Sequence, residues 1–216
     1  QKVWTSGAHF ADYGMVVARS DPSALKHKGL TYFFLDMKTP GVEAKPIKQI
    51  SGSANFNEVF FNDVRIPDSQ RLGAEGDGWK VALTTLMNER LAVGDPPGLD
   101  FDQIFEATKE IEVEDGLAIK NSEVRQKMAD WYVQSRGLQY TKYRSMTALS
   151  KGQTPGPELS ISKLVTASKM QEVSSYALDL MDMAGYVHHD KNPVMRNLFQ
   201  NGYFFSAAMR LSLIHI

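Results

Sequence analysis

Two adjacent residues of opposite charge, Glu89 and Arg90, lie in the segment 76–90, whose composition favours a helix. At about 100° per residue, Trp79 and Leu83 fall on the same helix face as Arg90, and Glu89 lies at the edge of that face. A guanidinium on an apolar face needs an anion as its partner, because burying an unpaired charge is costly. That anion is a side chain, a group of carbonyls or a ligand in a pocket. The same two residues could instead close a solvated helix end, so the spacing leaves both interpretations open.

The residues before this segment favour strands. Short stretches rich in β-branched and aromatic residues alternate with turn sequences, such as 21–23 and 39–41. The expected strands span residues 15–18, 30–35, 42–47 and 57–66, and Pro67 should end the last of them. Short strands at this spacing predict a compact antiparallel barrel or sandwich.

The residues after the segment favour helices. The expected helices span residues 101–113, about 121–150, 164–181 and 193–208. Together with the helix of segment 76–90, they predict an antiparallel four-helix-type bundle. We therefore expect an α+β, multi-domain fold: an antiparallel β-barrel domain over residues 1–70, followed by a helical bundle over residues 71–210.

The composition is that of a soluble globular protein. The chain has 216 residues, of which 43% are hydrophobic and 23% charged, with a net charge of −1. No apolar run approaches the roughly 18 residues of a membrane span, and no cationic leader opens the chain, so we expect a cytoplasmic protein without a membrane partner. The lack of cysteine excludes disulfides and thiolate metal sites. No basic stripe indicates nucleic-acid binding, and the adjacent pair His188 and His189 does not predict a metal site.

Both ends of the sequence look artificial. Gln1 opens the chain directly in an expected strand, so we expect sequence upstream of it. Residues 211–216 match the in-frame translation of a sequencing-library adapter, and we expect them to be a non-native tail. An ordinary apolar tail is the alternative.

Four stretches, taken in order, resemble the acyl-CoA dehydrogenases. They are residues 2–7 (KVWTSG), 18–22 (ARSDP), 60–67 (FFNDVRIP) and 76–79 (GDGW). The resemblance covers residues 1–210 and rests on the ordered set of motifs. It implies the middle β domain of that family followed by most of its C-terminal helical domain.

The resemblance also implies FAD as the cofactor. In this family, the strand tryptophan packs on the flavin, and a hydroxyl two residues later hydrogen-bonds the reactive edge of the ring system. The matching residues are Trp4 and Ser6, with Thr5 between them in the same cofactor-binding segment. A planar flavin needs an aromatic neighbour, and a nearby hydrogen bond tunes its ring.

The implied reaction converts an acyl-CoA thioester into the trans-2-enoyl thioester. A glutamate takes the α-proton while the β-hydrogen leaves as hydride to FAD, and an apolar pocket raises the pKa of that glutamate. In the isovaleryl and long-chain types, the glutamate lies on this helix directly before an arginine, which implies Glu89 as the base. Arg90 would then order the base region or the substrate pocket. The alternative is a glutamate that follows Arg210, where most members of the family carry it.

Two departures from the family pattern keep other functions open. Residues 112–115 are acidic where the family often has an arginine that contacts flavin pyrophosphate across a subunit interface. Residues 179–183 keep neither glycine of the family's Gln-x-Phe-Gly-Gly segment. We therefore consider three functions: a dehydrogenase that passes electrons to an electron-transferring flavoprotein, an oxidase that uses oxygen, and a non-catalytic subunit of a heteromeric enzyme. A homo- or hetero-oligomer is expected in each case.

Overall fold

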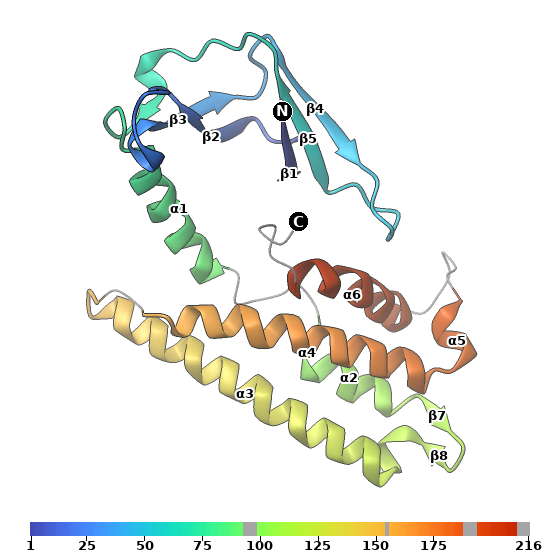
Figure 1. The fold of residues 1–216 in the computed structure, drawn as a ribbon. Coiled ribbons are helices and arrows are strands. Elements are labelled where there is room, and N and C mark those ends of the chain that lie inside the picture. Colours follow the sequence, from blue (N-terminus) through green and yellow to red (C-terminus); the bar gives the residue numbers. More distant parts are fainter. Residues whose placement is uncertain (93–98, 154–155, 188–193, 211–216) are drawn as a thin grey trace. The chain divides into compact units, whose positions relative to one another are not determined.

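The computed structural model describes residues 1–92, 99–153, 156–187 and 194–210, except for the side chains of 90–92, 159 and 194–196 (Figure 1). The chain forms two compact units, Gln1–Glu89 and Arg90–Ile216. One helix, Gly78–Ala92, begins in the first unit and ends in the second, and each of the other elements lies within one unit.

The first unit contains two antiparallel three-stranded sheets. Their strands are β1 (Lys2–Ser6), β2 (Tyr13–Arg19), β3 (Leu30–Asp36), β4 (Val42–Ile47), β5 (Phe56–Phe61) and β6 (Arg71–Leu72). The strand orders are β1-β5-β4 and β2-β3-β6. The predicted closed barrel is not confirmed, because no strand pairing joins the two sheets among the described residues.

Turn geometry sets the strand ends in this unit. The expected strand 57–66 ends at Phe61 instead of at Pro67. Asp63 has a φ of 50°, in the left-handed region, and the Asn62 N–H donates to the Gly41 carbonyl at 2.9 Å. The chain therefore turns before the proline, which the alternating pattern alone did not show.

Two short 3₁₀ helices connect strands of this unit: Lys26–Gly29 precedes β3, and Asp68–Gln70 precedes β6. Helix α1 (Gly78–Ala92) follows β6. Its first turn lies directly on β3: a Cβ on Gly78 would be 2.7 Å from backbone atoms of Leu30 and Thr31. The Thr31 hydroxyl accepts a hydrogen bond from the Gly76 N–H at 3.1 Å. Further along, the Tyr32 hydroxyl donates to the Thr85 hydroxyl at 3.5 Å. Glycine is thus required at the start of α1, because any side chain would separate the helix from the sheet.

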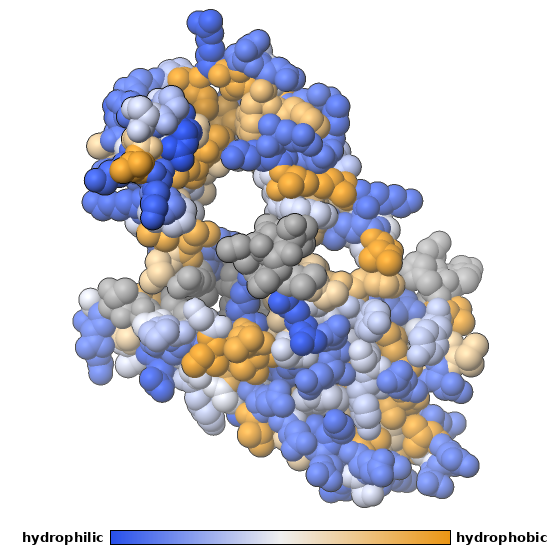
Figure 2. All heavy atoms as spheres, viewed as in Figure 1, coloured by the Kyte–Doolittle hydropathy of each residue, from blue (hydrophilic) through white to orange (hydrophobic). Residues whose placement is uncertain are grey.

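The apolar face predicted for α1 is not the face that meets this sheet. Val81, Ala82 and Thr85 are half-buried, whereas Trp79 and Leu83 are exposed within the unit. Other large apolar side chains are also exposed, and hydrophobic residues lie among hydrophilic ones in Figure 2.

The second unit is mostly helical. Its elements are α2 (Phe101–Thr108), β7 (Glu112–Val113), β8 (Gly116–Leu117), a 3₁₀ helix (Ala118–Lys120), α3 (Ser122–Ser150), α4 (Glu158–Leu180), α5 (Met183–Tyr186) and α6 (Val194–Arg210). The predicted helix 101–113 ends at Thr108, and a two-stranded hairpin takes its place. Asn121 caps α3, because its side chain accepts from the N–H groups of Glu123 and Val124. None of the described helices is long and apolar enough to cross a membrane.

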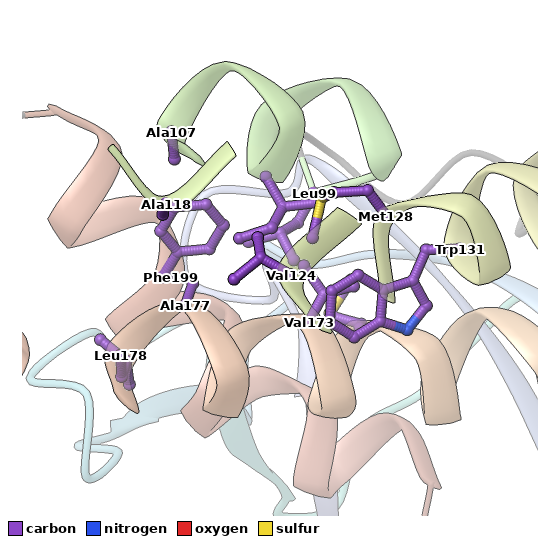
Figure 3. Packing of buried hydrophobic residues seen from close by; sticks show 12 residues of the cluster. Leu99, Ala107, Ala118, Val124, Met128, Trp131, Val173, Ala177, Leu178 and Phe199 are labelled. Carbon is purple, nitrogen blue, oxygen red and sulfur yellow. The ribbon is translucent and has the colours of Figure 1, made fainter. Parts of the chain in front are cut away.

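One apolar core joins the helices of this unit (Figure 3). Ile104 from α2, Trp131 from α3, Val173 from α4 and Phe199 from α6 are all buried in it. This core packs helices of the second unit together, while the predicted bounds of the helical domain and its four-helix arrangement stay predictions.

Candidate active site

Strand β1 carries a β-bulge at the predicted tryptophan. Lys2 pairs with Val59 and Thr5 pairs with Asn57, so two residues of β1, Val3 and Trp4, lie opposite a single residue of β5. Trp4 has a φ of 65°, in the left-handed region that favours glycine. A bulky residue held there costs on the order of 1–3 kcal/mol, and such strain is commonly found at functional sites.

The bulge leaves Trp4 and Ser6 open on the strand surface. Trp4 is 40% exposed, and its ring meets Phe56 edge-on, with centroids 6.1 Å apart and an interplanar angle of 81°. Ser6 is exposed, whereas Thr5 between them is half-buried. An open aromatic surface and an open hydroxyl two residues apart fit a planar ring system with polar edges. The residues present therefore fit a flavin.

A fully buried asparagine lies beneath this part of β1. Asn57 has 0% exposure, and its Nδ2 donates to the Thr5 carbonyl at 2.9 Å. Its Oδ1 lies 3.0 Å from His9 Nδ1. No sequence motif marks Asn57 as a functional residue. Its position could have indicated a buried polar group, because residues 57 and 59 of a strand share one face and Val59 is buried.

The predicted base lies on α1, in the same unit. The side chain of Glu89 is exposed and has no hydrogen bond or ion pair with the described side chains. The side chain of Arg90 is outside the described residues. The structure thus brings Trp4, Thr5 and Ser6 together on one strand, and no described contact joins Glu89 to them.

The segment that lacks the family's glycines keeps an unusual backbone. It begins in the last turn of α4, and Asp182 has a φ of 49°. Glycine adopts this conformation freely, so an aspartate here is strained. The acidic stretch 112–115 belongs to the β7–β8 hairpin. No described group of histidine and carboxylate side chains is placed to hold a metal ion, and His188 and His189 lie outside the described residues.

A charge network around the buried Lys169 joins three helices of the second unit. Lys169 of α4, whose side chain is 3% exposed, donates to Asp100 Oδ1 at 2.5 Å and to Ser135 Oγ at 2.7 Å. Ser135 also donates to Asp100 Oδ1 at 2.5 Å, and Asp100 caps α2. Burial acts to raise the pKa of Asp100, but hydrogen bonds from Lys169, Ser135 and the Phe101 N–H outweigh it and leave that pKa below its ordinary value.

Known proteins provide an independent comparison. The family described as "Acyl-CoA dehydrogenase, C-terminal domain" matches residues 76–210. Acyl-CoA dehydrogenase FadE34 of Mycobacterium tuberculosis is 36% identical over 191 residues, which are 88% of this chain and 26% of that protein. Acyl-CoA dehydrogenase IpdE1 of Mycolicibacterium smegmatis is 35% identical over 189 residues, which are 86% of this chain and 46% of that protein. The chain thus spans about a quarter to a half of the length of these relatives.

Solved structures share the fold. The Tcur3481–Tcur3483 steroid ACAD superposes with a TM-score of 0.85 at 21% identity, covering 98% of this chain and 55% of that one. Butyryl-CoA dehydrogenase of Megasphaera elsdenii gives a TM-score of 0.74 at 22% identity, covering 95% and 55%. The motifs, the fold and the matched domain agree, and the chain belongs to the acyl-CoA dehydrogenase family.

Proposed function

We propose that the complete protein is an FAD-dependent acyl-CoA dehydrogenase that converts acyl-CoA thioesters into trans-2-enoyl-CoA. The observation that carries the proposal is the presentation of Trp4 and Ser6 on the bulged strand β1. Membership of the family supports it, because the chain belongs to a family of flavoprotein oxidoreductases.

Three residues of this chain carry distinct roles in the proposal. Trp4 offers its indole face to the flavin ring, and the Ser6 hydroxyl donates a hydrogen bond to the edge of that ring. Thr5 lies between them and supplies the carbonyl that fixes the strand. When bound, FAD supplies the acceptor for the β-hydride. The chain itself must then exclude water, orient the thioester and remove a proton.

Glu89 is the proposed acceptor of the α-proton, and Arg90 the residue that orders the substrate pocket. A carboxylate acts in this way when an apolar cover raises its pKa, since water otherwise stabilises its charge. The described residues do not provide that cover, because Glu89 is exposed. The proposal therefore requires acyl-CoA or other parts of the protein to cover Glu89. A glutamate that follows Arg210 is the rival base.

The proposal predicts a specific product. We would incubate the complete protein with straight-chain, cyclic and steroid side-chain acyl-CoAs and follow the thioesters by mass spectrometry. One class should lose two hydrogens when an electron-transferring flavoprotein or an artificial acceptor is added. The variant Glu89→Gln should lose this activity, and the control Glu172→Gln, an exposed glutamate on α4, should keep it. Turnover with oxygen alone would make the protein an oxidase, and no turnover with any thioester would refute the proposal.

A second candidate function is that of a partner subunit in a heteromeric dehydrogenase. The segment 179–183 favours it, because the strained Asp182 replaces a glycine that the family uses near a neighbouring subunit's flavin. One structural neighbour is the ChsE4–ChsE5 complex from Mycobacterium tuberculosis, which shows that heteromers exist in this fold. Purification of the complete protein with and without co-expressed homologues would separate the two functions, since a partner subunit turns over substrate only in the mixed complex.

A further inference from the structure

We propose that Asn57 is a positioning residue for the flavin site, and that it holds the bulge of β1 in the shape that presents Trp4 and Ser6. The inference rests on the proposed function for the identity of the ligand. Asn57 itself touches neither Trp4 nor Ser6 in any described hydrogen bond. It acts through the Thr5 carbonyl, which lies between those two residues.

The hydrogen bond to Thr5 is placed where the strand departs from regular pairing. Thr5 is the first residue after the bulge that returns to register, and its partner in that register is Asn57. The Asn57 side chain donates to the Thr5 carbonyl at 2.9 Å from a fully buried position. Water does not reach this amide, so its loss leaves the position without a replacement donor. The buried Asn57 side chain therefore holds the carbonyl of Thr5, the residue that follows the left-handed Trp4.

His9 is the second partner of the Asn57 amide. Because Asn57 Nδ2 donates to Thr5, Oδ1 is the atom that faces His9 Nδ1, at 3.0 Å. An amide oxygen only accepts, so Nδ1 of His9 must carry the hydrogen. The His9 ring also packs edge-on against Phe10, with centroids 4.8 Å apart and an interplanar angle of 86°. A reversed amide would place its oxygen against the Thr5 carbonyl, two acceptors together, so the Thr5 carbonyl fixes which end of Asn57 faces it.

The turn after β1 is fixed by a backbone hydrogen bond and by the Phe10 ring that also packs on His9. Gly7 follows Ser6 with a φ of 66°, and its N–H donates to the Asn55 carbonyl at 2.9 Å. A Cβ on Gly7 would lie 2.7 Å from the Phe10 ring. The ring that packs on His9 thus also closes on the turn. The strand carrying Trp4 and Ser6 is held on one side by Asn57 and at its end by this turn.

The test uses two changes at Asn57 that differ in one contact. Asn57→Asp keeps an acceptor for His9 and loses the donor to Thr5, whereas Asn57→Leu loses both. The control Asn62→Leu alters an exposed asparagine just after the same strand. Each variant of the complete protein is compared by FAD affinity and by hydrogen exchange of residues 2–7 and 42–47 in the flavin-free form.

We expect Asn57→Asp to bind FAD about tenfold more weakly, since the buried hydrogen bond to Thr5 is lost at the bulge, and Asn57→Leu, which also loses the contact with His9, to bind FAD more weakly still. Hydrogen exchange should rise in residues 2–7 and stay at the wild-type level in residues 42–47, which form β4. A general loss of stability would raise exchange in both segments. Equal effects on both segments, or an unchanged FAD affinity, would overturn the proposal.

A milder change guards against variants that fail to fold. His9→Ala removes an exposed side chain and leaves the Asn57 donor in place. It should raise exchange in residues 2–7 and weaken FAD binding less than Asn57→Asp does, and wild-type behaviour in both measurements would remove His9 from the proposal. A wild-type protein that binds no FAD would refute the proposed function, while the exchange data would still decide whether Asn57 holds β1.

Discussion

The ion pair between Asp100 and Lys169 is asymmetric, because the two partners differ in burial. The Lys169 side chain is 3% exposed, whereas that of Asp100 is 56% exposed. Loss of the carboxylate leaves a buried cation whose remaining partner among the described side chains is Ser135, whereas loss of the lysine leaves a carboxylate that water can reach. The two halves of the pair should therefore contribute unequally when they are removed.

We predict that Asp100→Asn lowers the free energy of unfolding by about 2–3 kcal/mol, and that Lys169→Met lowers it by about 1 kcal/mol. Asparagine caps a helix about as well as aspartate, so the first change isolates the charge. Urea denaturation of the complete protein measures both values. Lys38→Met, which removes an exposed ion pair with Asp12, should leave the free energy of unfolding close to the wild-type value, because water screens that pair. Equal losses for Asp100→Asn and Lys169→Met would contradict the account.

The same carboxylate predicts a pH dependence. The folded-state pKa of Asp100 lies below its unfolded value, so the stability it contributes is complete above the unfolded pKa of about 3.9. That contribution is lost as the pH falls through the folded pKa. The difference in unfolding free energy between wild type and Asp100→Asn should thus be constant from about pH 5 to 7 and shrink below about pH 4. A difference that grows on acidification would have the wrong sign.

Single residues differed in how far the sequence revealed them. The resemblance to the family marked Trp4, Ser6 and Glu89, because each lies in or shortly after a short motif that can be recognised locally in the sequence. Asn57 and Lys169 donate hydrogen bonds to residues 52 and 69 positions away in the sequence, and a local sequence pattern does not predict such a contact. The left-handed Trp4 was also beyond prediction, because bulges follow from strand register and not from composition.

Two helix glycines have opposite structural contexts. A methyl group on Gly78 would lie 2.7 Å from the backbone of β3, whereas one on Gly137 of α3 would meet nothing within 4 Å. Gly78 therefore permits the close approach of α1 to the sheet. Gly137 lies within a helix and has no such role.

We predict that Gly78→Ala lowers the free energy of unfolding by about 1–3 kcal/mol, since the helix must move away from β3. Gly137→Ala should raise it by roughly 0.5–1 kcal/mol, because alanine favours a helix more than glycine does. Thermal and urea unfolding of the two variants give the comparison directly. Stabilisation by Gly78→Ala would show that α1 does not depend on this contact.

Helices and strands were predictable where a strong local pattern is present. The spans of β4 and α3 follow from alternation and from the Asn121 cap. The predicted ends of β5 and α2 were wrong. A left-handed residue at Asp63 ends the strand early, and a two-stranded hairpin follows Thr108, although both sequences favour a longer element. Periodicity also did not show which face of α1 packs on the β3 sheet. Trp79 and Leu83 belong to the apolar stripe of the sequence, and yet both are exposed.

Across the full chain, the α+β character was predicted and the closed barrel was not confirmed. Short alternating strands are compatible with either a closed barrel or separate sheets, and strand pairing decides between them. In the described residues, β6 has two residues and pairs only with β3, which leaves two three-stranded sheets. Membership of the family does not depend on barrel closure, because ordered motifs and a matched domain carry it.

The most direct measurement is an anaerobic titration of the complete protein with a panel of acyl-CoAs, following the visible absorbance of the flavin. Wild type should be yellow as purified, and at least one acyl-CoA should bleach it, whereas Glu89→Gln should bind flavin and stay unbleached. Bleaching that survives Glu89→Gln would assign the proton transfer to a glutamate beyond Arg210. A colourless wild-type protein, or one that no acyl-CoA bleaches, would contradict the assignment of this chain to a flavin-dependent dehydrogenase.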